Sequence, residues 1–133
     1  MRVNEINTWT AWQMAEAINQ GDVSAEEVTQ SCLDRIAKRE DAVRAWTFLD
    51  PDLALKQARA CDEQRTAGNP LDLLHGVPVG LKDIIDTADM PTENGSDHFK
   101  GRRPTRDAAS AALLRAAGAV ILGKTVTTEF AMT

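Results

Sequence analysis

The sequence has few of the features that mark membrane, secreted or metal-binding chains. It contains two cysteines and two histidines in 133 residues, and its unbroken apolar runs are only a few residues long. A membrane-spanning helix needs about 20 consecutive apolar residues, so none is predicted. The N-terminus also lacks the basic segment followed by an apolar segment that is typical of a secretory leader. We therefore expect a cytoplasmic protein that does not contact a membrane.

The two cysteines, Cys32 and Cys61, fall in segments that are predicted to be helical. They form no Cys-x-x-Cys pair, and neither histidine stands at ligand spacing from them. This pattern favours small apolar side chains in a reducing compartment over a disulfide. No metal site and no cofactor site are predicted.

Positive charge is the minority sign in this chain. The 15 basic and 20 acidic side chains give a net charge of −5, which disfavours direct binding of nucleic acid through its phosphates. A local basic cluster, which we define as Lys100, Arg102, Arg103 and Arg106, is predicted to be a solvated loop, with an anionic partner as the alternative. With 43% apolar and 26% charged residues, the chain has the composition of one ordinary globular domain.

Residues 1–70 are predicted to be mainly helical. Thr10–Gln13 and Ser24–Glu27 both match the capping box, in which two side chains satisfy the free N–H groups at a helix start. An Asp-Pro pair begins a further helix over 51–66, because proline is favoured at the first helical position. Residues 45–49 are expected to form a strand or a buried connector.

Residues 71–133 are predicted to start an α/β core. Alternating apolar residues indicate a strand over 77–82, and a second short strand is expected over 119–122. An alanine-rich helix over 108–117, capped by Asp107, lies between them. Strand, helix and strand together predict a βαβ unit with a right-handed crossover and a parallel pair.

The predicted fold class is therefore α/β, with N-terminal helices followed by a first βαβ part, in one domain spanning 1–133. Two or three strands cannot bury both faces of a sheet, so the predicted fold is incomplete. Its open apolar edge predicts self-association or association with the rest of a larger fold. Residues 86–106 form a long turn-rich loop, which in a compact domain tends to be functional or mobile.

Residues Gly118–Thr125 match the phosphate-binding pattern G-x-x-x-x-G-K-[ST] letter for letter. That loop needs a strand before it and a helix after it, so that backbone N–H groups face the phosphates. In this chain a helix ends at Gly118 and the middle residues favour a strand. We interpret the match as accidental and keep a nucleotide binder as the last alternative. Lys124 is expected to be a strand-end lysine on a surface or in a cleft.

Lys82 is the candidate catalytic residue. An extended backbone would place Val77, Val79 and Leu81 on one face of the strand. Lys82 would then lie on the opposite face beside Gly80, which leaves room for another group. Burial among apolar neighbours favours the neutral amine, which acts as a general base. An ordinary lysine whose amine reaches solvent is the alternative.

Two blocks of sequence carry a family resemblance. The runs 74–84 (LHGVPVGLKDI) and 91–96 (PTENGS) closely resemble the amidase signature family of serine hydrolases, and so does 107–125 with its continuation at 129–131. The helical first half is similar to the N-terminal region of that family as well. The resemblance covers essentially the whole chain and implies a mixed sheet covered by helices.

Members of this family cut amide bonds with a serine nucleophile, a second serine on a cis peptide, and a lysine. By resemblance Lys82 is that lysine, which accepts a proton through the second serine and later returns it to the leaving nitrogen. The family's serine-rich segment would follow Thr133, and neither Ser96 nor Ser110 stands in a matching position. We therefore expect these 133 residues alone to be inactive, and a small amide to be the substrate of the complete enzyme.

Two functions remain open. The first is the N-terminal part of an amidase-family hydrolase, and the second is a non-catalytic binding or assembly module derived from that fold. The parent activity could be hydrolysis of simple amides, of urea-like carboxylated amides, or of glutamine for transamidation of charged tRNA. Of the histidines, His75 is predicted to be structural and His98 to be an exposed loop residue.

Overall fold

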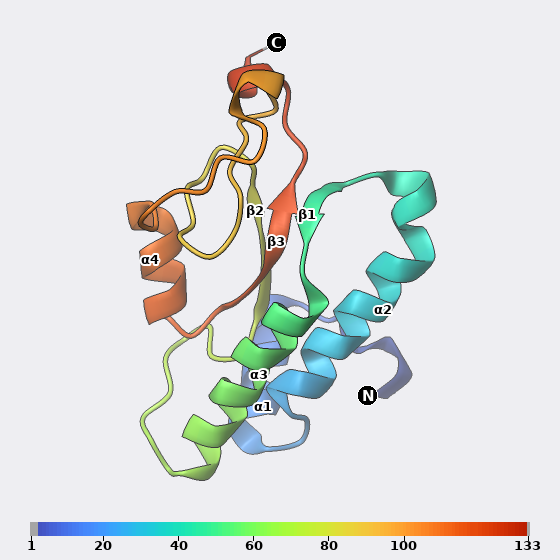
Figure 1. The fold of residues 1–133 in the computed structure, drawn as a ribbon. Helices are drawn as coiled ribbons and strands as arrows, with labels where there is room; N and C mark the ends of the chain where they lie inside the picture. The colour runs from blue at the N-terminus through green and yellow to red at the C-terminus, as the bar shows by residue number, and fades with distance from the viewer. Residues whose placement is uncertain (1–2, 133) are drawn as a thin grey trace.

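The computed structural model describes residues 3–132, which form a three-stranded mixed sheet flanked by helices (Figure 1). The strands are β1 (Trp46–Leu49), β2 (Pro78–Lys82) and β3 (Val120–Thr125). β3 is the central strand, paired antiparallel with β1 and parallel with β2. The predicted parallel pair and the α/β class are confirmed, and the segment expected to be a strand or a buried connector is a strand over Trp46–Leu49.

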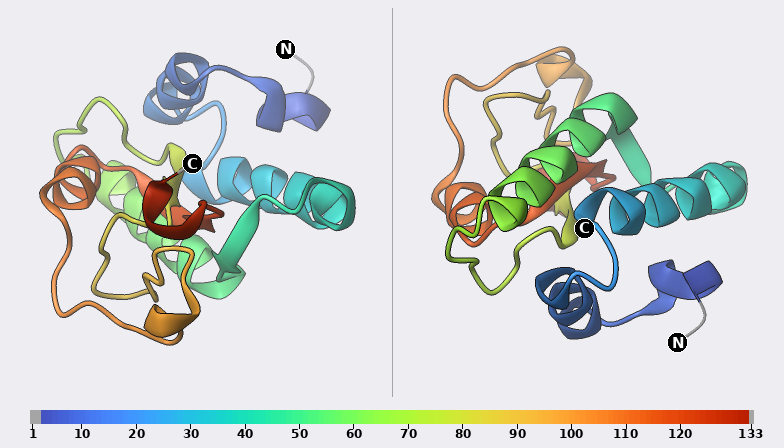
Figure 2. Two further views of the ribbon diagram at one scale, coloured as in Figure 1. Left: turned by 90° about the horizontal axis from the view of Figure 1, so that it is seen from above. Right: turned by 90° about the horizontal axis from the view of Figure 1, so that it is seen from below.

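Helices surround this sheet, with α4 on one side of the strands and α2 on the other (Figures 1 and 2). The helical elements are η1 (Val3–Thr8), α1 (Ala11–Gln20), α2 (Ala25–Val43), α3 (Pro51–Thr66), η2 (Asp97–Phe99), α4 (Ala109–Ala116) and η3 (Glu129–Ala131). Among residues 3–132, none of these helices is long and apolar enough to cross a membrane.

The helix starts in the first half form as the sequence predicts. Thr10 and Gln13 cap α1 reciprocally, and Ser24 and Glu27 do the same for α2. The Asp50 side chain accepts a hydrogen bond from the third residue after it, at the start of α3. These contacts satisfy N–H groups that have no partner within the helix, so local sequence fixes where each helix begins.

The predicted cap of α4 is wrong. The N-cap is Ala108, and no side chain caps the helix there. The two oxygens of Asp107 instead accept from the backbone N–H of Ala88 at 2.8 Å and from Nε of Arg115 at 2.9 Å. The carboxylate is held by a loop and by a later turn of α4, and neither partner is apparent from the local pattern.

The pair of β2 and β3 contains a bulge, but the apolar residues change face before β2 and not at the bulge. Val79 pairs with Ile121 but Gly80 pairs with Gly123, so one residue of β3 is unmatched between them. Val77 lies before the strand and packs in one core cluster, whereas Val79 and Leu81 pack against the other. The prediction that these three apolar residues share one face is therefore wrong.

The core lies on both faces of the sheet because β3 alternates between them. Val120 and Leu122 pack with α1, α2 and α3 in the larger cluster. Ile121 packs with Leu81 and with residues of α4 and the loop before it in the smaller cluster. The two clusters bury β3 from Val120 to Lys124, as expected for a central strand, and leave only Thr125 half-buried.

Close backbone contact joins β1 to β3 at Gly123. A Cβ atom added there would lie 2.2 Å from the carbonyl oxygen of Phe48, so no side chain fits without moving β1. We predict that Gly123→Ala lowers the free energy of unfolding by about 3 kcal/mol or more, at the upper end of the cost of overpacking. Urea unfolding followed by tryptophan fluorescence measures this loss.

The matched control is Gly68→Ala. Nothing lies within 4 Å of a Cβ atom added at Gly68, where only the left-handed φ of 74° opposes a side chain. That conformation costs about 1–2 kcal/mol. Equal losses in the two variants would show that the contact with Phe48 does not constrain the sheet.

Candidate functional site

Lys82 is the last residue of β2, at the carboxyl end of the parallel pair and beside Thr125 of β3. Its side chain is exposed, so the predicted burial of this amine is wrong for the part of the chain that the structure describes. The space expected over Gly80 is occupied, because a Cβ atom added there would lie 2.7 Å from the Trp46 ring. Lys82 thus stands at the edge of the packed region rather than inside it.

The backbone around Lys82 is held firmly. The N–H of Ile85 donates to the carbonyl of Lys82 at 2.9 Å and closes a turn directly after β2. The N–H of Asp83 donates to the carbonyl of Thr125 at 3.0 Å and so extends the contact with β3. The N–H of Asn94 then donates to the carbonyl of Asp83 at 2.9 Å, which brings a distant part of the loop to the same place.

Asp83 is buried, with 2% of its surface exposed. Its carboxylate accepts from the backbone N–H of Glu93 at 3.2 and 3.3 Å. Burial raises the pKa of this carboxyl group, although that hydrogen bond and the charge of Lys124 act in the opposite direction. As expected, Asp83 does not form an ion pair with Lys82; it faces the loop instead.

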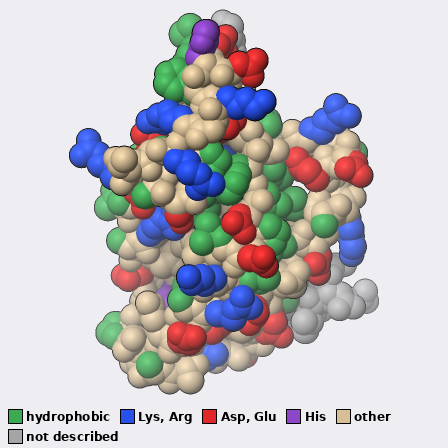
Figure 3. All heavy atoms as spheres, viewed as in Figure 1, with side chains coloured by type: hydrophobic (Ala, Val, Ile, Leu, Met, Phe, Trp, Pro, Cys, Tyr) green, Lys and Arg blue, Asp and Glu red, His purple; other side chains and the backbone are tan. Residues whose placement is uncertain are grey.

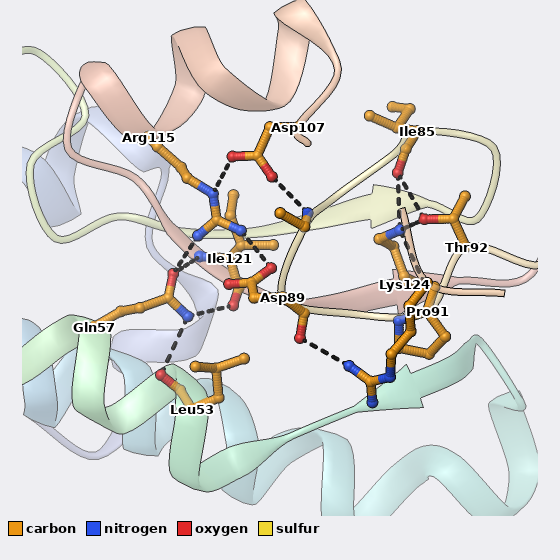
Figure 4. A network of polar contacts seen from close by, with 12 residues as sticks. Leu53, Gln57, Ile85, Asp89, Pro91, Thr92, Asp107, Arg115, Ile121 and Lys124 are labelled. Atoms are coloured by element: carbon orange, nitrogen blue, oxygen red, sulfur yellow. Dashed lines mark hydrogen bonds and ion pairs between the residues drawn. The ribbon is translucent and has the colours of Figure 1, made fainter. Parts of the chain in front are cut away.

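Lys124 is fully buried, and the expectation of a surface or cleft lysine is wrong. Its Nζ donates to the carbonyl of Ile85 at 2.8 Å, to the carbonyl of Pro91 at 3.1 Å, and to Oγ1 of Thr92 at 2.6 Å (Figure 4). These three bonds use all three N–H groups of an ammonium. Burial lowers the pKa of Lys124, and the negative charge of Asp83 partly opposes that shift.

A second polar network lies beside the first (Figure 4). Arg115 of α4 contacts Asp107 at 2.9 Å, Asp89 at 2.7 Å and the side-chain oxygen of Gln57 at 3.2 Å. Gln57 of α3 in turn bonds to both the N–H and the carbonyl of Ile121, at 3.1 and 3.0 Å. The network ties α3, α4 and the loop to β3. Sequence reasoning missed it, because its members lie far apart in the chain and match no motif.

The basic cluster is partly bound to the protein itself. Arg102 forms two bonds with Asp86, at 2.8 and 3.0 Å, and these lower the pKa of that carboxyl group. Arg103 donates to a loop carbonyl at 3.4 Å, while Lys100 and Arg106 are exposed. The face drawn in Figure 3 carries basic side chains in both its upper and its lower half, interspersed with acidic ones. An anionic partner for the basic cluster stays a prediction.

The histidines lie as expected. His75 is buried, and its Nε2 lies 2.9 Å from the carbonyl oxygen of Cys61. This contact ties the segment before β2 to α3 and confirms a structural role. His98 is exposed in η2.

Burial raises the pKa of both free thiols, Cys32 and Cys61. Residues 3–132 contain no group of three His, Cys, Asp or Glu side chains that could hold a metal ion.

The segment after β3 packs onto the long loop, at the top of Figure 1. Oγ of Ser96 donates to Glu129 at 2.7 Å, and the N–H of Phe130 donates to the carbonyl of Asn94 at 2.8 Å. The rings of Phe99 and Phe130 meet edge to face, with centroids 5.7 Å apart. The loop over 86–106 is thus held at the end of the sheet where Lys82 lies.

Stability is predicted to depend on pH in opposite ways at Asp83 and Asp86. The folded-state pKa of Asp83 is raised above its ordinary 3.8, so its contribution to the free energy of unfolding falls as the pH rises above that value. The pKa of Asp86 is lowered, so its contribution is present above 3.8 and is lost as the pH falls below it. Urea unfolding of Asp83→Asn and Asp86→Asn across this range measures both.

The half-buried pair of Asp86 and Arg102 is expected to contribute about 0.2–1 kcal/mol at neutral pH. The difference between wild type and Asp86→Asn should therefore grow with rising pH, and that between wild type and Asp83→Asn should shrink. Slopes of the same sign for the two variants would contradict the assignment.

Known proteins resemble this chain in sequence. The family model described as Amidase matches residues 27–133. A glutamyl-tRNA(Gln) amidotransferase subunit of Salinispora arenicola is 45% identical over 130 residues, which cover 98% of this chain and 26% of that protein.

Solved structures agree with the sequence relatives. The peptide amidase of Stenotrophomonas maltophilia superposes with a TM-score of 0.88 at 37% identity, covering 96% of this chain and 26% of that one. A fatty acid amide hydrolase gives a TM-score of 0.88 at 25% identity, covering 96% of this chain and 23% of that one. The chain spans about a quarter of the length of these proteins.

Proposed function

This chain belongs to the amidase family, and from that membership we propose that it is the N-terminal part of a hydrolase that cleaves carbon–nitrogen amide bonds. The observation that carries the proposal is the match of residues 27–133 to the family model, including the block around Lys82. Two of the similar proteins carry amide hydrolysis in their names, one acting on peptides and one on fatty acid amides.

In this proposal Lys82 is the proton acceptor. A serine hydroxyl attacks the amide carbonyl, its proton passes to the amine through a second serine, and an oxygen–carbon bond forms. The proton then goes to the leaving nitrogen as the carbon–nitrogen bond breaks, and water releases the acid in a second step. Both serines would come from residues outside 1–133, by resemblance to the family.

The position of Lys82 supports this role. It lies at the carboxyl end of two parallel strands, which is the edge where α/β sheets bind ligands. Its side chain is exposed and therefore accessible to another part of the protein. A general base works in contact with the proton it accepts and away from bulk water, so this exposed position needs a covering segment from another part of the protein. The missing cover adds to the reason already given for expecting the 133 residues alone to be inactive, which is that neither serine of the family stands in a matching position.

The relatives named as amidotransferase subunits favour a second candidate within the same chemistry. Hydrolysis of a glutamine side-chain amide would supply ammonia to a partner enzyme that transfers it to a charged tRNA. The same lysine would serve, because the bond that is cut is again a primary amide. Contact with nucleic acid would then fall to the partner rather than to this acidic chain.

The test uses the longest form of the protein that its gene encodes. We predict that Lys82→Ala lowers the rate of ammonia release from carboxamides by at least about 10³-fold, because it removes a member of a catalytic unit. The exposed Lys38 of α2 provides the matched control, and Lys38→Ala should keep the wild-type rate. Activity that survives Lys82→Ala would refute the assigned role.

A non-catalytic assembly module is the alternative function. Within the described residues β1 and β2 pair only with β3, so both are edge strands whose second row of backbone groups is available for pairing. We expect the 133-residue chain to self-associate, and sedimentation equilibrium measures this. A monodisperse monomer that melts cooperatively would contradict the expectation. Association without any ammonia release by the longest form would favour the module.

A further inference from the structure

We infer that Lys124 is a positioning residue for Lys82: its buried ammonium fixes the turn that leaves β2, and thereby the backbone that carries Lys82. The inference rests on the proposed role of Lys82 and adds to it a residue that does not touch the substrate. It starts from the contacts of Lys124, which is a fully buried amine outside the reaction proposed above.

A short chain of hydrogen bonds links the two lysines. The carbonyl of Lys82 accepts from the N–H of Ile85 at 2.9 Å. The carbonyl of the same Ile85 accepts from Nζ of Lys124 at 2.8 Å. The turn is therefore closed by its own backbone on one side and anchored to β3 by the ammonium on the other. Without that anchor, the Ile85 carbonyl would keep only a longer contact of 3.5 Å with Oγ1 of Thr92.

The same nitrogen also holds the far end of the loop. Nζ of Lys124 donates to the carbonyl of Pro91 and to Oγ1 of Thr92, which is fully buried. Oγ1 of Thr92 also lies 3.5 Å from the carbonyl oxygen of Ile85. The ammonium of Lys124, this carbonyl and this hydroxyl are therefore each in contact with the other two. One side chain thus joins both ends of loop 85–92, as Figure 4 shows.

Sheet geometry keeps Lys124 away from the reaction. Lys124 pairs with Leu81, and Thr125 pairs with Lys82. Successive side chains of a strand point to opposite faces, and paired residues share a face. The ammonium of Lys124 therefore lies on the face opposite to the Lys82 side chain. It acts on Lys82 through the backbone, not through direct contact.

The ammonium of Lys124 is buried and binds three acceptors. A buried ammonium carries a large desolvation cost unless it is fully hydrogen-bonded. An apolar side chain of similar length would avoid that cost, but it would leave the two carbonyls and the hydroxyl without their donor. The buried carboxylate of Asp83 lies after Lys82 and holds Glu93, the next residue of the loop, in a similar way. A lysine at position 124 therefore supplies hydrogen-bond donors to loop 85–92 that an apolar side chain would not.

The chain offers a close set of variants. Thr92→Val removes the hydroxyl that contacts Lys124 at nearly constant volume, and Thr92→Ser keeps it. Thr87 provides the control, because it lies in the same loop, is fully buried, and has a hydroxyl without a hydrogen-bond partner among residues 3–132. Lys124→Met removes the ammonium itself, and the threonine variants remain informative if that protein does not fold.

The first measurement is hydrogen–deuterium exchange of the peptide covering 83–92, by mass spectrometry, in the longest form of the protein. We expect Thr92→Val and Lys124→Met to speed exchange at the Ile85 amide by about tenfold or more, the loss of one net hydrogen bond being worth roughly that factor. Thr92→Ser and Thr87→Val should match wild type. Exchange in α2 reports opening elsewhere, and it should not change.

The second measurement separates positioning from stability. Per folded molecule, Thr92→Val should lower kcat on a carboxamide by about 10- to 100-fold with KM unchanged, since a small displacement of a catalytic group costs that much. Thr92→Ser should restore the rate, and Thr87→Val should leave it within about twofold of wild type. A purely structural role would reduce the amount of folded enzyme without changing kcat per folded molecule.

The outcomes distinguish this inference from the proposed function. If Lys82→Ala is inactive but Thr92→Val keeps the wild-type kcat, the positioning role is overturned while the role of Lys82 stands. Exchange at Ile85 that is the same in Thr92→Val and Thr87→Val overturns it as well. If Lys82→Ala keeps full activity, the proposed function fails, and the positioning of Lys82 for catalysis fails with it.

Discussion

The parallel pairing of β2 with β3 is the constraint on which the rest of the molecule depends. Parallel strands cannot be joined by a tight turn, so the chain leaves β2, crosses through a long loop and α4, and only then enters β3. The loop begins at the carboxyl end of the sheet, where its carbonyls have no strand partner. The ammonium of Lys124 supplies the missing donors, and Asp83 supplies acceptors for loop N–H groups.

Polar and charged side chains in the described structure therefore act mainly as links between segments. Arg115 and Gln57 join two helices and the loop to the backbone of β3, while Lys124 joins β3 to the two ends of a single loop. The apolar clusters hold the helices on the sheet, and the polar networks hold the segments that have no regular structure. Lys82 lies at the boundary between the sheet and the long loop. Its side chain is exposed, and its backbone carbonyl is held by the N–H of Ile85.

Sequence alone predicted those features that neighbouring residues decide. Both capping boxes, the helix over 51–66 and the two parallel strands follow from local spacing. The burial of Lys124 could not be predicted in this way, because β3 runs on to Thr125 and the acceptors come from a loop more than 30 residues earlier. The diversion of Asp107 to Arg115 depends in the same way on how distant segments meet. Of the candidate site, the position of Lys82 at the end of β2 was predicted and its exposure was not.

The strand order also has a consequence for biosynthesis. β3 lies between β1 and β2 in space but follows both along the chain. On the ribosome the two outer strands emerge first and have no strand to pair with until β3 is added, since pairing with β2 starts at Val120 and pairing with β1 starts at Gly123. Helices can form during translation because their hydrogen bonds are local, whereas this sheet must wait for its central member. Nascent chains that end before Val120 expose two unpaired strands, and their regular structure is limited to helices.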